Sequence, residues 1–117
     1  MDIQESDLQS IREVIERQIA AFKEGNAVAA FSQAAPGIQR QFGTPEKFVQ
    51  MVQNAYPSVY RPRSVMFESV LDVEGLPAQQ VMMMDDDGEL VRATYIMQQQ
   101  VLGDWKIAGC YLTPLGL

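Results

Sequence analysis

The first quarter of the chain repeats apolar residues at spacings of three and four, the period of a helix with one buried face. Ser6 and Gln9 match a capping box at its start, and Gly25 supplies the left-handed residue on which many helices end. The pattern therefore predicts one long amphipathic helix, with a core face formed by Leu8, Ile11, Ile15, Ile19 and Phe22.

Shorter helical segments follow. Asn26 is a suitable N-cap for a helix over 27–34, and the Pro-Gly pair at 36–37 is typical of a turn. Thr44 precedes a proline and a glutamate, an arrangement that favours a helix start, so a further helix is predicted over 45–55.

After Pro62 the spacing of apolar residues changes to two, the period of a strand with one buried face. Turns too short for a parallel crossover separate the strand-like runs, which cover 65–73, 81–84, 90–100 and 105–112. Helices first and strands second predict an α+β fold, with N-terminal helices packed on an antiparallel sheet and 1–117 forming a single domain. The long third run and Gly109 in the fourth favour a curved sheet, a half-cone with a pocket at its open end.

The composition of the chain limits the partners and the catalytic groups that it can use. The 117 residues carry a net charge of −6, which disfavours nucleic acid and anionic membranes as partners. There is no histidine, the most common general base and metal ligand, and Cys110 is the only cysteine. The acidic first residues do not look like a signal peptide, so a cytoplasmic location is expected.

Several blocks of sequence point to a known family. They are AAPGIQ at 34–39, FGTPEKF at 42–48, VYRPR at 59–63 and IAGCYL at 107–112. These blocks resemble the bacterial family of domain of unknown function 4864, and GDWKI at 103–107 is similar to the closing hairpin of the nuclear-transport-factor-2-like (cystatin-like cone) superfamily. The resemblance implies the cone fold and brings no established activity.

A candidate ligand site lies between the last predicted helix and the first strand. Tyr56, Tyr60, Arg61 and Arg63 cluster there, near the expected mouth of the half-cone. Guanidinium groups and tyrosine hydroxyls suit carboxylates or phosphates, which predicts a small anionic or amphipathic ligand. Alternatively, the tyrosines cover the core edge and the arginines pair with surface acids.

Tyr95 shares a predicted strand face with Val91, Ala93 and Met97 and can direct its hydroxyl into the same cavity. A buried tyrosine more often finds a backbone partner. An isomerase- or dehydratase-type enzyme would need a cavity carboxylate beside Tyr95. The carboxylates of the first strand run, Glu68 and Asp72, are expected to face solvent.

The run Met82–Met84 places methionine on both faces of a strand. Together with Val81, Val91 and Ile96 it predicts an apolar outer sheet face, which we expect to form a homodimer. The alternatives are a strand covered on both sides within the monomer and a surface that docks another protein.

Two further features favour structural roles. Asp85, Asp86 and Asp87 lack the alternating oxygen ligands of a calcium loop and are typical of a hairpin turn, so no metal or other cofactor is predicted. Cys110 lies among apolar neighbours, which favours an unreactive thiol. The leading hypothesis is therefore a non-catalytic domain that binds a small ligand and forms a homodimer.

Overall fold

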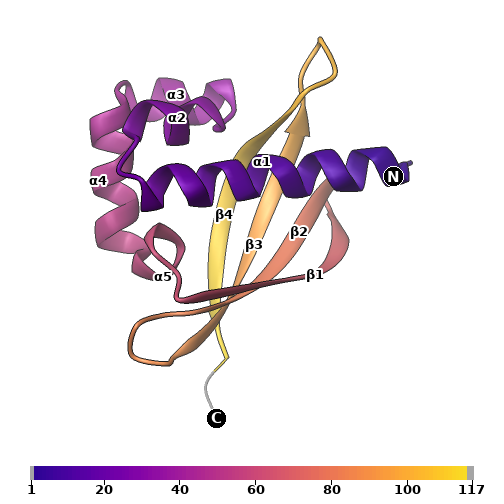
Figure 1. Ribbon diagram of the computed structural model, residues 1–117. Coiled ribbons are helices and arrows are strands. Elements are labelled where there is room, and N and C mark those ends of the chain that lie inside the picture. The colour runs from indigo at the N-terminus through magenta and orange to yellow at the C-terminus, as the bar shows by residue number, and fades with distance from the viewer. Residues whose placement is uncertain (1, 116–117) are drawn as a thin grey trace.

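The computed structural model describes residues 2–115, and its helices all precede its strands (Figure 1). The helices are α1 (Glu5–Lys23), α2 (Ala27–Ser32), α3 (Pro36–Phe42), α4 (Pro45–Ala55) and α5 (Pro57–Tyr60). The strands are β1 (Ser64–Val73), β2 (Leu76–Met84), β3 (Leu90–Gln99) and β4 (Trp105–Pro114).

Helix α1 begins earlier than the pattern predicts, and its buried face matches the predicted one at Ile11, Ile15 and Phe22 but not at Leu8. Its N-cap is Gln4, whose backbone N–H donates to the Asp7 carboxylate at 3.1 Å, so the predicted cap at Ser6 is wrong. Leu8 is 38% exposed. The buried residues of α1 are Ile11, Val14, Ile15, Gln18, Ala21 and Phe22.

The next caps are confirmed. Asn26 Oδ1 accepts from the Ala29 N–H at 3.0 Å, and Thr44 Oγ1 accepts from the Lys47 N–H at 3.2 Å. The turn predicted at 36–37 is wrong, because Pro36 is the first residue of α3 and fits the start of a helix, where no backbone N–H is needed.

The strands form one antiparallel sheet in the order β1-β2-β3-β4, which confirms the α+β prediction. Figure 1 shows α1 lying across one face of this twisted sheet, while α2 to α5 gather at one side. The outer edge of β4 is partly paired: the Ile107 N–H donates to the Gln33 carbonyl at 2.9 Å, and the Ala35 N–H donates to the Ile107 carbonyl at 2.8 Å.

A bulge changes which residues of β4 face inward. Ile107 pairs with Met97 but Gly109 pairs with Ile96, so one extra residue, Ala108, lies between them. Strict alternation along β4 would place Cys110 on the other face of the sheet from Ile107. The bulge instead brings Cys110 onto the same inner face as Ile107.

The methionine run also divides between the two faces. Val81 and Met83 are fully buried in the core beneath α1. Met82 and Met84 point the other way, as alternation along a strand requires. The expectation that Val81 and Val91 belong to the outer face is therefore wrong, because Val91 pairs with Met83 and also packs against the core.

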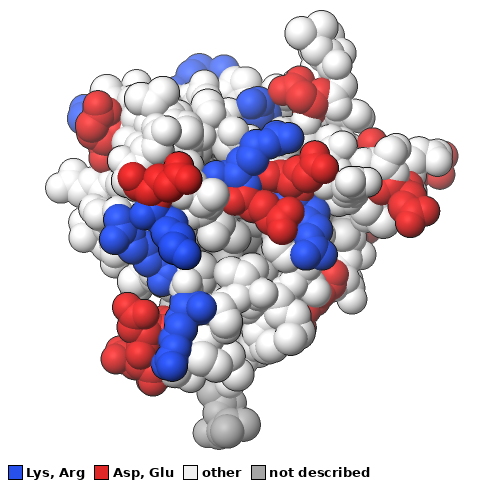
Figure 2. Space-filling model, viewed as in Figure 1, with Lys and Arg blue, Asp and Glu red and all other residues white. Residues whose placement is uncertain are grey.

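The core fills the space between the helices and the inner sheet face. Phe48 is central to its aromatic part, with ring centroids 6.1 Å from Phe22, 5.5 Å from Phe31 and 5.9 Å from Phe42. Acidic and basic side chains are interspersed on the face shown in Figure 2. Within the described residues, no helix combines the length and apolar character needed to cross a membrane.

Candidate functional site

A cavity of about 530 Å³ lies between the helices and strands β3 and β4. The helices contribute Gln18, Phe22, Ile38, Phe48 and Tyr56 to its wall. The sheet contributes Tyr95 and the segment 107–110, so the bulged part of β4 forms one side. Ala55 is exposed and also lines the cavity, which places it at the mouth.

The cavity wall carries no formal charge. None of the described residues that line it is aspartate, glutamate, lysine or arginine. Most of the lining is aliphatic or aromatic, and its polar side chains are Gln18, Gln41, Tyr56, Tyr95 and Cys110. An ion without a counter-charge is costly to bury, so this cavity suits an uncharged molecule.

The Tyr95 hydroxyl is the one buried side-chain polar atom in the described residues that has no hydrogen-bond partner. Tyr95 is 1% exposed and lies opposite Cys110 in the β3–β4 register. Burial, followed by the neighbouring Cys110, raises the pKa of the Tyr95 phenol well above its ordinary value. The hydroxyl therefore stays protonated near neutral pH and remains an available donor.

The surroundings of Cys110 disfavour the thiolate form of its side chain. Burial raises the pKa of its thiol to about 12, so the thiolate needed for reaction is scarce at neutral pH. The prediction of an unreactive thiol agrees with this environment, but the bulge makes Cys110 part of the cavity wall.

Gln18 is a polar member of the wall that sequence reasoning misses. It is 4% exposed, and its Nε2 donates to the Ala30 carbonyl at 3.1 Å. That bond fixes the amide orientation and leaves the carbonyl oxygen of Gln18 as an acceptor. A signal was present in the sequence, because Gln18 lies three residues after Ile15 and four before Phe22, within the apolar stripe.

The predicted ligand residues do not converge on one place. Tyr56 and Tyr95 line the cavity. Tyr60 packs its ring 5.5 Å from that of Phe22, outside the cavity wall, and the exposed Arg61 guanidinium lies 5.0 Å from the Tyr60 ring centre. Arg63 is exposed, and its backbone N–H donates to the Met84 carbonyl at 2.7 Å.

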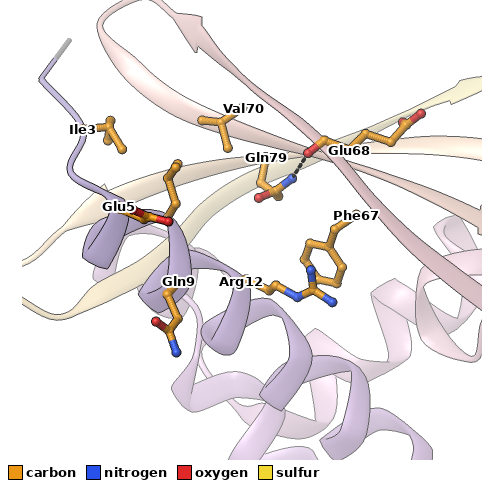
Figure 3. Close-up of a pocket in the computed structure, with 9 residues that line it drawn as sticks. Ile3, Glu5, Gln9, Arg12, Phe67, Glu68, Val70 and Gln79 are labelled. Carbon is orange, nitrogen blue, oxygen red and sulfur yellow. Dashed lines mark hydrogen bonds between the residues drawn. The ribbon is translucent and has the colours of Figure 1, made fainter.

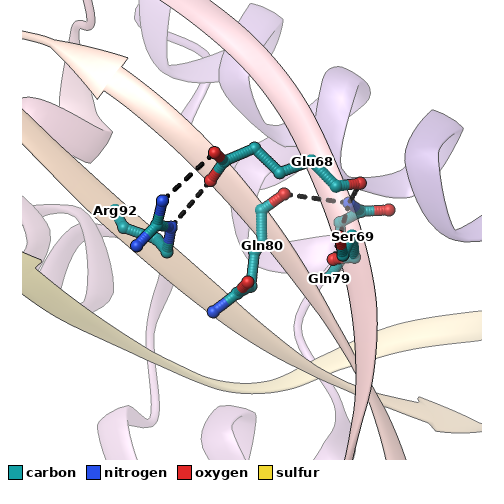
Figure 4. A network of polar contacts seen from close by, with 5 residues as sticks. All are labelled: Glu68, Ser69, Gln79, Gln80 and Arg92. Carbon is teal, nitrogen blue, oxygen red and sulfur yellow. Dashed lines mark hydrogen bonds and ion pairs between the residues drawn. The ribbon is translucent and has the colours of Figure 1, made fainter.

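The carboxylates of β1 are committed elsewhere. Glu68 forms a two-pronged ion pair with Arg92, at 2.7 Å and 3.2 Å, across the outer sheet face (Figure 4). The hydrogen bond from Arg92 lowers the pKa of Glu68. Asp72 accepts from the Gly75 N–H at 2.8 Å in the β1–β2 turn. Among the described residues that line the cavity, there is therefore no carboxylate to serve as the base in the enzyme hypothesis.

A second hollow, of about 620 Å³, lies between the start of α1 and strands β1 and β2 (Figure 3). This hollow is a groove, and it is more open to solvent than the cavity beside Tyr95. Arg12, whose guanidinium sits 4.5 Å from the Phe67 ring centre, is also paired with Glu16 at 3.5 Å. The side-chain amide nitrogen of Gln79 donates hydrogen bonds to backbone carbonyls of β1 and β2. With its main donors already engaged, this groove is a weaker candidate than the less open cavity beside Tyr95.

No group of three or more potential metal ligands occurs in the part of the chain that is described. Asp85 has a structural task, because its Oδ1 accepts from the N–H groups of Asp87 and Glu89, each at 2.9 Å. These bonds hold the β2–β3 turn.

Comparison with known proteins gives one match. No curated protein and no solved structure matches the chain. Membership of the nuclear-transport-factor-2-like superfamily stays a prediction, with which the arrangement of α1 across the sheet is compatible. The sequence profile of the family described as "Domain of unknown function (DUF4864)" matches residues 4–115, nearly the whole length, and the chain therefore belongs to this family.

Proposed function

We propose that the domain binds a small, uncharged and largely apolar molecule in the cavity between the helices and the sheet. The observation that carries this proposal is the unpartnered Tyr95 hydroxyl beside a cavity whose wall has no formal charge. A buried hydroxyl without a partner is costly, so proteins rarely retain one without a use. A bound molecule that accepts its hydrogen bond removes that cost.

The sequence predicts a small anionic or amphipathic ligand, and the cavity suits an amphipathic molecule better than an anionic one. Arg61 and Arg63 are absent from its wall, so an anion held there would have no cation beside it. Removing a carboxylate or phosphate from water without such a partner costs several kcal/mol. A neutral molecule with an apolar body and a polar end has no such cost.

Blocking the mouth tests the proposal. In a thermal-shift screen against a metabolite library, a neutral compound is expected to raise the melting temperature of the wild-type protein, because a ligand that binds only the native state stabilises it. Ala55→Trp is expected to abolish that shift by filling the mouth. Asn54→Trp is the matched control, since Asn54 is an exposed neighbour on α4 that does not line the cavity.

Two outcomes would count against the cavity. One is a library in which no uncharged compound shifts the melting temperature. The other is a ligand whose shift survives Ala55→Trp as well as it survives Asn54→Trp, because that ligand would bind elsewhere.

We also propose that the outer sheet face, defined by Met66, Leu71, Met82, Ile96 and Tyr111, forms a homodimer. Met66, Leu71 and Tyr111 are 59%, 42% and 48% exposed. Strands of nine or ten residues give a face about 30 Å long and 15–20 Å wide. The product, about 450–600 Å², reaches only the low end of the roughly 600–1,000 Å² of surface per partner in a standard interface. Charge supports a second copy as the partner.

The charges of the outer sheet face are already balanced. The Arg92–Glu68 pair bridges β1 and β3 on this face (Figure 4). Two copies can therefore meet face to face without bringing unpaired like charges together, a requirement of an interface that contacts itself.

Mass in solution tests the dimer. Sedimentation at about 50 µM is expected to give twice the chain mass, since biological dimers commonly hold at micromolar concentrations. Met66→Glu is expected to give monomer, because a two-fold interface receives the new charge twice. Leu102→Glu is the control: Leu102 is 95% exposed but lies on the β3–β4 turn, away from the outer sheet face. A wild-type monomer at this concentration refutes the dimer.

A further inference from the structure

We infer that the ligand of this cavity is a neutral carbonyl compound whose oxygen accepts a hydrogen bond from the Tyr95 hydroxyl. This inference rests on the proposed function and goes beyond it by naming the polar group of the ligand. The two buried polar side chains of the wall, Tyr95 and Gln18, carry it.

Tyr95 lines the cavity, and its buried hydroxyl is a donor without a partner. Its O–H has no acceptor among the described residues, and its raised pKa keeps the proton in place. A phenol is a better donor than acceptor because its oxygen lone pair is partly delocalised into the ring. The group that meets Tyr95 is therefore best matched by a strong neutral acceptor, and the carbonyl oxygen is the most common one.

Gln18 has the opposite role. The amide nitrogen of Gln18 already donates to the Ala30 carbonyl. The side-chain carbonyl oxygen of Gln18 accepts no hydrogen bond within the described residues and is therefore free to accept one. A ligand that carries an N–H or O–H would find its acceptor in Gln18 and not in Tyr95. The two residues thus divide donor and acceptor functions between them, and a free Tyr95 donor calls for an acceptor on the ligand.

The rest of the cavity wall disfavours charged acceptor groups on the ligand. A carboxylate or phosphate would also accept from Tyr95, but no described lysine or arginine lines the cavity to offset its charge. The neighbouring Phe22, Phe42 and Phe48 rings offer an apolar surface to the body of the ligand. A ketone, ester or amide on an apolar body fits these constraints.

A matched pair of probes tests the polar group. Benzophenone and diphenylmethane have nearly the same shape, but only benzophenone carries a carbonyl oxygen. With the wild-type protein, we expect benzophenone to bind about tenfold more tightly in calorimetric titration, the effect of one hydrogen bond to an otherwise unsatisfied group. Diphenylacetate, which is anionic, is expected to bind more weakly than either.

Variants locate the donor. Tyr95→Phe is expected to bind both neutral probes with equal affinity, while Tyr56→Phe keeps the preference although Tyr56 also lines the cavity. Tyr95→Phe removes no protein hydrogen bond, so its melting temperature without ligand is expected to be no lower than that of the wild type.

The outcomes separate the two proposals. Equal binding of benzophenone and diphenylmethane to the wild-type protein leaves a functional cavity and overturns only the carbonyl inference. A preference that persists in Tyr95→Phe overturns it as well, because another donor is then responsible. If neither neutral probe binds the wild-type protein, the cavity does not accept small apolar molecules, and the proposed function falls together with the inference.

Discussion

Replacing Phe48 with alanine is expected to lower the free energy of unfolding by about 4 kcal/mol, a typical loss for a buried phenylalanine. Phe48 is 5% exposed, and its ring contacts those of Phe22, Phe31 and Phe42. It therefore joins α4 to α1, α2 and α3 in a single contact cluster. The space left by the ring would open into the ligand cavity, which limits how far the neighbours can collapse to fill it.

Urea unfolding followed by circular dichroism measures this loss. A domain of this size has about 5–15 kcal/mol of stability in total, so the variant stays measurable only if the parent is well above the lower end. Phe48→Leu keeps most of the volume and is expected to cost about 1.5 kcal/mol, which makes it the fallback variant. Val28→Ala, at a position that is 67% exposed, is the control and is expected to stay within about 0.5 kcal/mol of the parent.

A loss below about 1.5 kcal/mol for Phe48→Ala would contradict the central position of this ring, because it would show that the helices repack around the gap. Stronger binding of a bulkier neutral ligand by the variant would be a separate sign that the space joins the cavity.

Local chemistry explains what the sequence predicts well. A helix cap needs only a side-chain oxygen and an N–H three residues later, and Asn26 and Thr44 satisfy this within their own segments. The change of apolar period after Pro62 likewise belongs to one stretch of chain. Short turns then leave an antiparallel meander as the simplest sheet, which is the order observed.

Register is harder to predict because it depends on a partner strand. The bulge at Ala108 forms between β3 and β4, and a count of alternating residues along β4 alone cannot detect it. The bulge changes the candidate site, since it turns Cys110 toward the cavity. The face of α1 is also settled by packing: Gln18 occupies a core position that its polarity disfavours, while Leu8 remains partly exposed.

The candidate site shows why neighbours in sequence need not share a site. Tyr56 precedes the short helix α5 and lines the cavity, whereas Tyr60 is the last residue of α5 and packs against Phe22 outside the cavity. The two arginines that follow, Arg61 and Arg63, are exposed and do not line the cavity. Tyr95 reaches the cavity from a distant strand through the sheet register, which the sequence pattern of β3 does predict as an inward position.

Exchanging Gln79 for methionine is expected to lower the free energy of unfolding by about 2 kcal/mol, because it removes a buried donor that serves several backbone carbonyls at once. The Gln79 Nε2 donates to the carbonyl oxygens of Gln80 at 2.9 Å, Glu68 at 3.1 Å and Ser69 at 3.5 Å (Figure 4). Glu68 and Ser69 form the bulge of β1, where the regular ladder to β2 is interrupted. The side chain thus replaces part of the missing ladder.

Methionine has a similar length and no polar hydrogen, so Gln79→Met isolates the hydrogen bonds from the packing. Gln80→Met is the matched control: Gln80 is half-buried on the opposite face, and its side chain makes no hydrogen bond within the described residues, so a change under about 0.5 kcal/mol is expected. Hydrogen exchange adds a local measurement, since the β1 amides near the bulge should lose protection while those of β3 and β4 do not. Equal stability of the two variants would show that water replaces the Gln79 amide at the bulge, and that the edge strand holds its shape without it.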